Sequence, residues 1–250
     1  MAPTETDARR RHHGAGAVGG ALMTRLDEIA GLVPADARAA ADIGYDHGKL
    51  ILRLAEAHPK LQITGVEKQH DASARFWRVL GESSSLRSRV SLVHGDGLEP
   101  LRKQETEVIV LAGLGERRIV DVLERGRDVV GRVKRMVFGP LDTRAILRPY
   151  LRSLGWSPVA ERLIKSRGRF YQVFAAEPGG PPVQPDTWLI GTDLFHPRHP
   201  LLAEFLQSLH ANFEPLAARS DDAEQRIPMF AAAIERIMAG LERRDFGTAD

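Results

Sequence analysis

A regular alternation of short β-branched runs with helical segments is the feature that most limits how this chain can fold. The predicted strands are residues 39–43, 62–66, 90–93, 108–112 and 135–138. The predicted helices cover residues 48–57, 72–81, 118–125 and 143–154. A βαβα rhythm of this kind predicts a mostly parallel, doubly wound sheet with helices on both faces.

The end of this rhythm differs from its beginning. Two strand-like runs, residues 157–163 and 170–176, are joined by the Ser-Arg-Gly segment at residues 166–168, which predicts an antiparallel hairpin. A hairpin after a parallel sheet is typical of class I methyltransferases and unusual in dinucleotide dehydrogenases. The predicted fold is therefore an α/β, Rossmann-like sheet that ends in an antiparallel hairpin.

The chain divides into four predicted parts. Residues 1–20 are interpreted as a disordered basic tail, residues 21–178 as the α/β domain, and residues 179–198 as a Pro/Gly-rich linker. Residues 199–245 are predicted to form an antiparallel helical pair, because apolar residues recur there every three or four positions. The two apolar stripes are Leu202, Phe205, Leu209, Phe213 and Leu216, and Ile227, Phe230, Ile234, Ile237 and Leu241.

Composition excludes several kinds of site. The chain has no cysteine, which rules out disulfides, thiol catalysis and thiolate metal sites, and its histidines lack metal-ligand spacing. We therefore predict no bound metal. The chain has no apolar run long enough to span a bilayer and no secretory leader, so a cytoplasmic location is expected.

The most informative segment is the glycine turn at residues 41–48, where a predicted strand runs into a helix. Asp42 and Asp46 lie around Gly44, and the G-x-G-x-x-G pattern that receives a pyrophosphate is absent. Two carboxylates would repel a phosphate but suit a ligand that carries a sulfonium and an ammonium group. Both acids could equally be helix caps.

Further polar or small residues follow the next predicted strands in order. Glu67 ends the second strand, where an acid can accept both hydroxyls of a ribose. Asp96 follows the third strand, where it could accept from an adenine amino group, and small residues 112–115 follow the fourth. The predicted cofactor-binding residues are Asp42, Gly44, Glu67, Lys68, Asp96, Gly97, Ala112 and Gly113.

At these segments the sequence resembles the bacterial tRNA (adenine-N1) methyltransferases that modify adenine 22. The resemblance is carried by residues 41–48, 95–98 and 112–115, with further similarity at residues 26–34 and 168–177, and it extends over residues 22–213. It implies a class I methyltransferase fold, S-adenosylmethionine as cofactor and tRNA as substrate. The same match implies cofactor-binding roles for Asp42, Gly44, Glu67 and Asp96.

Two departures from the family affect the substrate side. Glu116 stands where the family usually has glycine, and Gly139-Pro140-Leu141 replaces the usual Gln-Pro-Asn. A carboxylate could ease the positive charge that develops on a methylated base, so Asp46 and Glu116 are the candidate catalytic residues. The alternatives are that Asp46 caps a helix and that Glu116 is a solvated acid at a helix start.

Basic residues indicate a surface for RNA. Arg144, Arg148 and Arg152 are four apart and would share one face of the predicted 143–154 helix. A second basic cluster, in the predicted hairpin, lies beside aromatic residues. The residues predicted to bind RNA are Arg144, Arg148, Arg167, Arg169 and Tyr171. An ordinary solvated face explains the helical row equally well.

Three functions remain open from the sequence. The first is methylation of adenine N1 in tRNA. The second keeps the cofactor but acts on another nucleic acid or a small molecule, as the altered residues 139–141 would allow. The third is a non-catalytic cofactor- or RNA-binding relative, in which Glu116 crowds the channel for methyl transfer. The oligomeric state cannot be read from the sequence.

Overall fold

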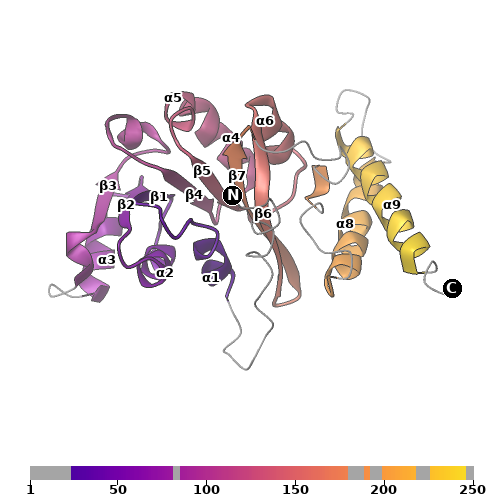
Figure 1. The fold of residues 1–250 in the computed structure, drawn as a ribbon, viewed down its shortest axis with the longest axis horizontal. Coiled ribbons are helices and arrows are strands. Elements are labelled where there is room, and N and C mark those ends of the chain that lie inside the picture. The colour runs from indigo at the N-terminus through magenta and orange to yellow at the C-terminus, as the bar shows by residue number, and fades with distance from the viewer. Residues whose placement is uncertain (1–23, 81–84, 180–188, 192–198, 218–225, 246–250) are drawn as a thin grey trace, which may run out of the picture.

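The computed structural model describes residues 24–80, 85–179, 189–191, 199–217 and 226–245. The predicted tail at residues 1–20 lies outside this part of the chain, as does most of the predicted linker. The described residues form a seven-stranded sheet with helices on both faces, and two longer helices lie beyond one edge (Figure 1).

The sheet has the strand order β3-β2-β1-β4-β5-β7-β6. Its first five strands are parallel, and β7 pairs antiparallel with both β5 and β6. Their bounds are β1 Ala39–Ile43, β2 Gln62–Glu67, β3 Val90–His94, β4 Val108–Ala112, β5 Arg135–Gly139, β6 Trp156–Ser166 and β7 Arg169–Pro178. The Rossmann-like sheet and its terminal hairpin, predicted from the sequence, are confirmed. The hairpin turns at Arg167 and Gly168, both with positive φ, as a two-residue primed turn requires.

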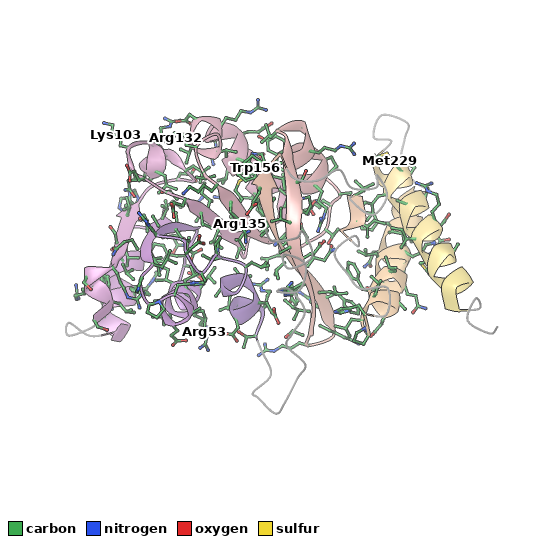
Figure 2. The ribbon with its side chains drawn as sticks, in the orientation of Figure 1. Arg53, Lys103, Arg132, Arg135, Trp156 and Met229 are labelled. Atoms are coloured by element: carbon green, nitrogen blue, oxygen red, sulfur yellow. The ribbon has the colours of Figure 1, made fainter. Side chains whose placement is uncertain are left out.

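Each face of the sheet has its own apolar core. One core joins the strands to α1 (Arg25–Ala30), α2 (Lys49–Ala57) and α3 (Ala72–Leu80). The other joins them to α4 (Glu116–Arg125), α5 (Arg127–Val130) and α6 (Leu147–Ser153). Figure 1 shows these two layers below and above the strands. Trp156, labelled in Figure 2, begins β6 and is buried in the second core. Two 3₁₀ turns, Ser85–Ser88 and Glu99–Lys103, complete the connections.

One helix differs from the prediction. The sequence pattern places a helix at residues 143–154, whereas α6 begins only at Leu147. The residues before it cannot be helical, because Ala145 has φ 56° and the backbone N–H groups of Arg144 and Ile146 donate to the Glu116 side chain. A tertiary contact therefore overrides the local preference for a helix.

The predicted C-terminal helical pair is present as α8 (Leu202–Ala217) and α9 (Arg226–Asp245). Phe213 and Phe230 are in contact, with ring centroids 4.5 Å apart and ring planes tilted by 46°. They belong to a third core that Leu163 of β6 and Phe170 of β7 also join. The helical pair is therefore packed against the tip of the hairpin. Met229 on α9, labelled in Figure 2, is about half exposed.

Candidate functional site

The carboxyl ends of the parallel strands form one edge of the sheet, and the strand order reverses between β1 and β4. Ligands of doubly wound sheets bind at this reversal, because neighbouring connections leave toward opposite faces and open a crevice. Two cavities of about 260 and 300 Å³ lie here. Both are lined by Gly44, Asp46 and Gly113.

The two cavities bring together every residue that the sequence predicted for the cofactor. Asp42 and Ala112 line the first cavity, and Gly44 and Gly113 line both. The predicted residues that line the second cavity alone are Glu67, Lys68, Asp96 and Gly97. Their proximity agrees with the prediction, while their contacts with a ligand stay a prediction.

Asp42 is the most unusual group at this edge. Its side chain is only 2% exposed, and its Oδ2 atom has no hydrogen-bond partner within the described residues. Burial, together with the negative charge of Glu67, raises the pKa of Asp42 to about 7. An unpartnered buried carboxylate is costly, so a cationic or hydrogen-donating ligand group in the first cavity would relieve that cost.

Glu67 is oriented by backbone N–H groups. Its Oε1 accepts from Lys68 at 2.9 Å and from Gln69 at 3.1 Å. Its Oε2 accepts from the N–H of Asp46 at 3.3 Å, which ties the end of β2 to the turn after β1. The carboxylate is therefore held in one orientation beside the second cavity before any ligand arrives.

Asp96 follows β3 and is shared with a basic residue of α4. Its Oδ2 accepts from Arg125 Nη1 at 2.9 Å, and this hydrogen bond lowers the pKa of Asp96. The pair is substantially exposed, so Asp96 is an ionised acid at the mouth of the second cavity.

Two glycines keep the edge open. Gly44 and Gly113 have φ values of 79° and 77°, in the left-handed region that disfavours side chains. At Gly113, a Cβ atom would meet nothing within 4 Å, so the space beside it is free. The end of β4 therefore leaves open space at this edge of the sheet.

Arg25 is a residue of the site that sequence reasoning missed. It begins α1 and lines the first cavity with Asp42. Its Nη1 atom has no hydrogen-bond partner in the described chain, and burial lowers its pKa. Its guanidinium lies 4.9 Å from the centre of the Tyr171 ring. No sequence pattern distinguishes Arg25 from the other basic residues, because only the fold brings it to the cavity that Asp42 also lines.

Asp46 is exposed and adopts φ 48°. The interpretation of Asp46 as a helix cap is wrong, because the N-cap of α2 is Gly48 and makes no side-chain cap hydrogen bond. Asp46 Oδ1 lies 2.8 Å from His47 Nδ1, at the rim of both cavities. It therefore stays available to a ligand.

Glu116 is buried, with 6% of its surface exposed, so its interpretation as a solvated acid is wrong. Its Oε2 accepts from the backbone N–H groups of Arg144 at 3.1 Å, Ile146 at 3.0 Å and Leu147 at 3.3 Å. Burial raises the pKa of Glu116 against these hydrogen bonds. Glu116 lines neither the first nor the second cavity, so it does not narrow the space beside Gly113.

The predicted basic helical face is not formed. Arg144 lies before α6, and its Nε is 2.6 Å from Asp142 Oδ2. Arg148 is buried and forms an ion pair with Glu161, so it cannot belong to a solvated RNA-binding row. Arg167 and Arg169 are exposed on the hairpin, and their contact with RNA stays a prediction.

The described residues contain neither a metal-binding cluster nor a membrane-spanning helix. Among the described residues, no group of three or more acids and histidines is placed to hold a metal ion. No helix in the described ranges is long and apolar enough to cross a membrane.

The sequence of this chain matches a known family over most of the α/β fold. Residues 22–174 match the family model described as a methyltransferase domain. The chain belongs to the methyltransferase domain family. This assignment agrees with the sheet order, with the terminal hairpin and with the acids placed at successive strand ends.

Specific methyltransferases are similar to this one. The Bacillus subtilis tRNA (adenine(22)-N(1))-methyltransferase is 30% identical over 158 residues, or 63% of this chain. The match covers 66% of that relative, slightly under two thirds of its length. The solved structure of the B. subtilis m1A22 tRNA methyltransferase TrmK has a TM-score of 0.69 and 25% identity, and covers 89% of this chain and 98% of that one.

A second solved structure is similar in fold. Streptococcus pneumoniae Sp1610 in complex with S-adenosyl-L-methionine has a TM-score of 0.71 and 23% identity, and covers 86% of this chain and 98% of that one. The resemblance stated from the sequence, and the fold it implied, are confirmed by these relatives.

Proposed function

We propose that this methyltransferase transfers a methyl group from S-adenosylmethionine to N1 of an adenine in tRNA. The observation that carries the proposal is the buried, unpartnered Oδ2 of Asp42, which lies in a cavity that also contains Gly113 and Arg25. The named activity of the B. subtilis relative and the ligand of the S. pneumoniae structure support it.

The residues of the two cavities fit this cofactor. Arg25 and Asp42 present opposite charges in one cavity, which suits the carboxylate and ammonium of an amino acid group. Glu67, held by three backbone N–H groups, would accept hydrogen bonds from the ribose hydroxyls. Asp96 would accept from the adenine amino group through the oxygen that Arg125 leaves free.

The chemistry asks mainly for placement. S-adenosylmethionine, when bound, supplies an electrophilic methyl group on a sulfonium. Adenine N1 attacks with a lone pair, so no proton has to be removed beforehand, and alignment of the two reactants would supply most of the acceleration. The open space at Gly113 provides the approach, and the target base must leave its stack to reach it.

Two carboxylates have different parts in this proposal. Asp46 lies at the rim shared by both cavities, where it would ease the positive charge that develops on the methylated base. Glu116 holds residues 144–147 by their N–H groups and would act as a positioning residue. This division replaces the expectation that both acids act on the base.

The exposed hairpin residues Arg167 and Arg169 are proposed to contact tRNA phosphates, with Tyr171 beside them. A tRNA substrate also implies that the enzyme acts in the cytoplasm. The exposed Leu141, which stands where the family carries an amide, motivates a second candidate substrate, a different RNA.

The first test is calorimetric titration with S-adenosylmethionine of the wild type, Asp42→Ala and Glu67→Ala. Asp36→Ala is the matched control, because Asp36 is exposed and lines none of these cavities. We expect saturable binding by the wild type and the control, and at least a hundredfold weaker binding by both site variants, since buried charge contacts contribute several kcal/mol. Absent wild-type binding in a folded sample would exclude the cofactor.

The second test is methylation of unmodified tRNA transcripts, with digestion to nucleosides to detect 1-methyladenosine. Methylation of a different nucleoside would reject adenine N1 and keep the enzyme class. Cofactor binding without transfer to any RNA would instead favour a non-catalytic relative.

A further inference from the structure

A third cavity lies between the methyltransferase sheet and the C-terminal helices. Its volume is about 360 Å³, within the range of sites for small organic groups. Its walls come from the loop after β5, from β7 and from α8. No residue that lines it also lines either of the two cavities at the Gly113 edge.

The floor of this cavity contains a polar group without a partner. Arg148 is 6% exposed; its Nη2 pairs with Glu161, and its Nη1 has no hydrogen-bond partner within the described chain. Its guanidinium lies 4.2 Å from the centre of the Phe174 ring. The Arg148–Glu161 pair is neutral overall, so Nη1 suits a neutral acceptor, such as a carbonyl or ring nitrogen, better than an anion.

The remaining walls fit a flat ring. Aromatic side chains line the cavity from β7 and from α8: Phe170, Tyr171, Phe174, Phe205 and Phe213. Ser208 and Asn212, one turn apart on α8, add hydroxyl and amide groups. The carboxylates of Glu116 and Asp142 would repel a phosphate placed inside, whereas the exposed Arg169 at the wall can meet a phosphate outside.

We propose that this cavity binds a second, unmethylated base of the RNA, splayed out beside the target adenine. Unpaired bases are recognised in proteins by aromatic stacking and by hydrogen bonds to their edges. The base held here differs from the target, because methyl transfer takes place at the Gly113 edge and this cavity shares no lining residue with the two cavities there. The inference rests on the proposed function and adds a site that reads the nucleotide next to the target.

The test fills the cavity from α8 without touching the buried ion pair. Ser208→Trp places an indole in the cavity, and Gln207→Trp, at the neighbouring exposed position outside the cavity, is the matched control. Each is measured with unmodified tRNA transcripts, either intact or with one abasic nucleotide flanking the methylated adenine. Binding of S-adenosylmethionine is measured as well and should be unchanged in both variants.

We expect Ser208→Trp to raise KM for tRNA at least about tenfold, as loss of one stacked base does, while Gln207→Trp stays near the wild type. One flanking abasic nucleotide should weaken the wild type by a similar factor and have no further effect on Ser208→Trp. Equal KM values for the two variants would overturn the proposal. So would an abasic effect that persists undiminished in Ser208→Trp.

Two other outcomes are also decisive. If Ser208→Trp does not fold, Asn212→Phe on the same face of α8 takes its place against the same control. If the wild type methylates no tRNA, the proposed function fails, but tRNA affinity of the same variants and abasic transcripts still decides whether the cavity binds a base.

Discussion

Two regions use their charged residues differently: the sheet edge proposed to hold the cofactor (the cofactor edge) and the region next to α8 proposed to face the RNA (the substrate side). At the cofactor edge, Asp42 and Arg25 each keep a buried polar atom without a partner, and Asp46 is exposed. On the substrate side, Glu116 is bonded to three backbone N–H groups and Arg148 is paired with Glu161. The first region leaves buried atoms of Asp42 and Arg25 for a ligand. The second uses Glu116 and the Arg148–Glu161 pair to fix its own shape and leaves Nη1 of Arg148 for a ligand.

The difference lies in whether buried polar groups are satisfied by the protein itself or left for a ligand. Unsatisfied buried groups cost stability and are retained where a ligand will satisfy them. Residues 140–146 form neither a helix nor a strand, and the Glu116 side chain accepts hydrogen bonds from two of their backbone N–H groups. The departures from the family at Glu116 and at residues 139–141 therefore concern the architecture of the substrate side rather than the cofactor.

Breaking the buried pair should have the largest effect. We expect Arg148→Ala to lower the free energy of unfolding by about 3–5 kcal/mol, because Glu161 would keep a buried charge without its cation. Arg144→Ala breaks the exposed pair with Asp142 and should lower the free energy of unfolding far less. Urea unfolding measures both, and similar costs would show that burial does not distinguish these two pairs.

Glu116 allows the next comparison. Glu116→Ala removes the acceptor of three backbone N–H groups and should cost about 2–3 kcal/mol, whereas Glu116→Gln keeps one oxygen there and should cost about 1 kcal/mol. For a positioning residue, Glu116→Gln should retain kcat, and Glu116→Ala should lose it. A large, equal loss of kcat in both variants would instead assign Glu116 to the chemistry.

The free energy of unfolding should also depend on pH through Asp42. Its folded-state pKa of about 7 lies above its usual value, so the ligand-free folded state binds more protons between those two values. The free energy of unfolding should therefore fall as pH rises from 5 to 7, by at most about 1.4 kcal/mol per unit, and level off above 7. Asp42→Asn should lack this component.

The same titration bears on the ligand. A cationic group in the first cavity favours ionised Asp42, so affinity for S-adenosylmethionine should rise with pH and level off above about 7. Calorimetry between pH 5.5 and 8.5 measures this. A pH-independent affinity would mean that Asp42 does not contact the cationic part of the cofactor.

The parallel sheet, its terminal hairpin and the sheet edge that carries the acids could all be predicted from the sequence. Strands 39–43 and 108–112 were predicted with the bounds the structure has, because each is a short apolar run next to a turn. Asp42, Glu67 and Asp96 could be found for the same reason: an acid at the end of a parallel strand must lie at the ligand-binding edge whatever the packing.

The arrangement of the charged residues on the substrate side depends on tertiary contacts and could not be predicted from the sequence. The spacing of Arg144 and Arg148 indicated one helical face. However, the backbone N–H of Ile146 donates to Glu116, and α6 begins only at Leu147. Arg148 is buried in an ion pair with Glu161 of β6. Arg25 reaches the cavity that Asp42 lines through the packing of α1 on the sheet. These outcomes depend on residues distant in the chain, and local periodicity carries no information about which distant group will accept a hydrogen bond or neutralise a charge.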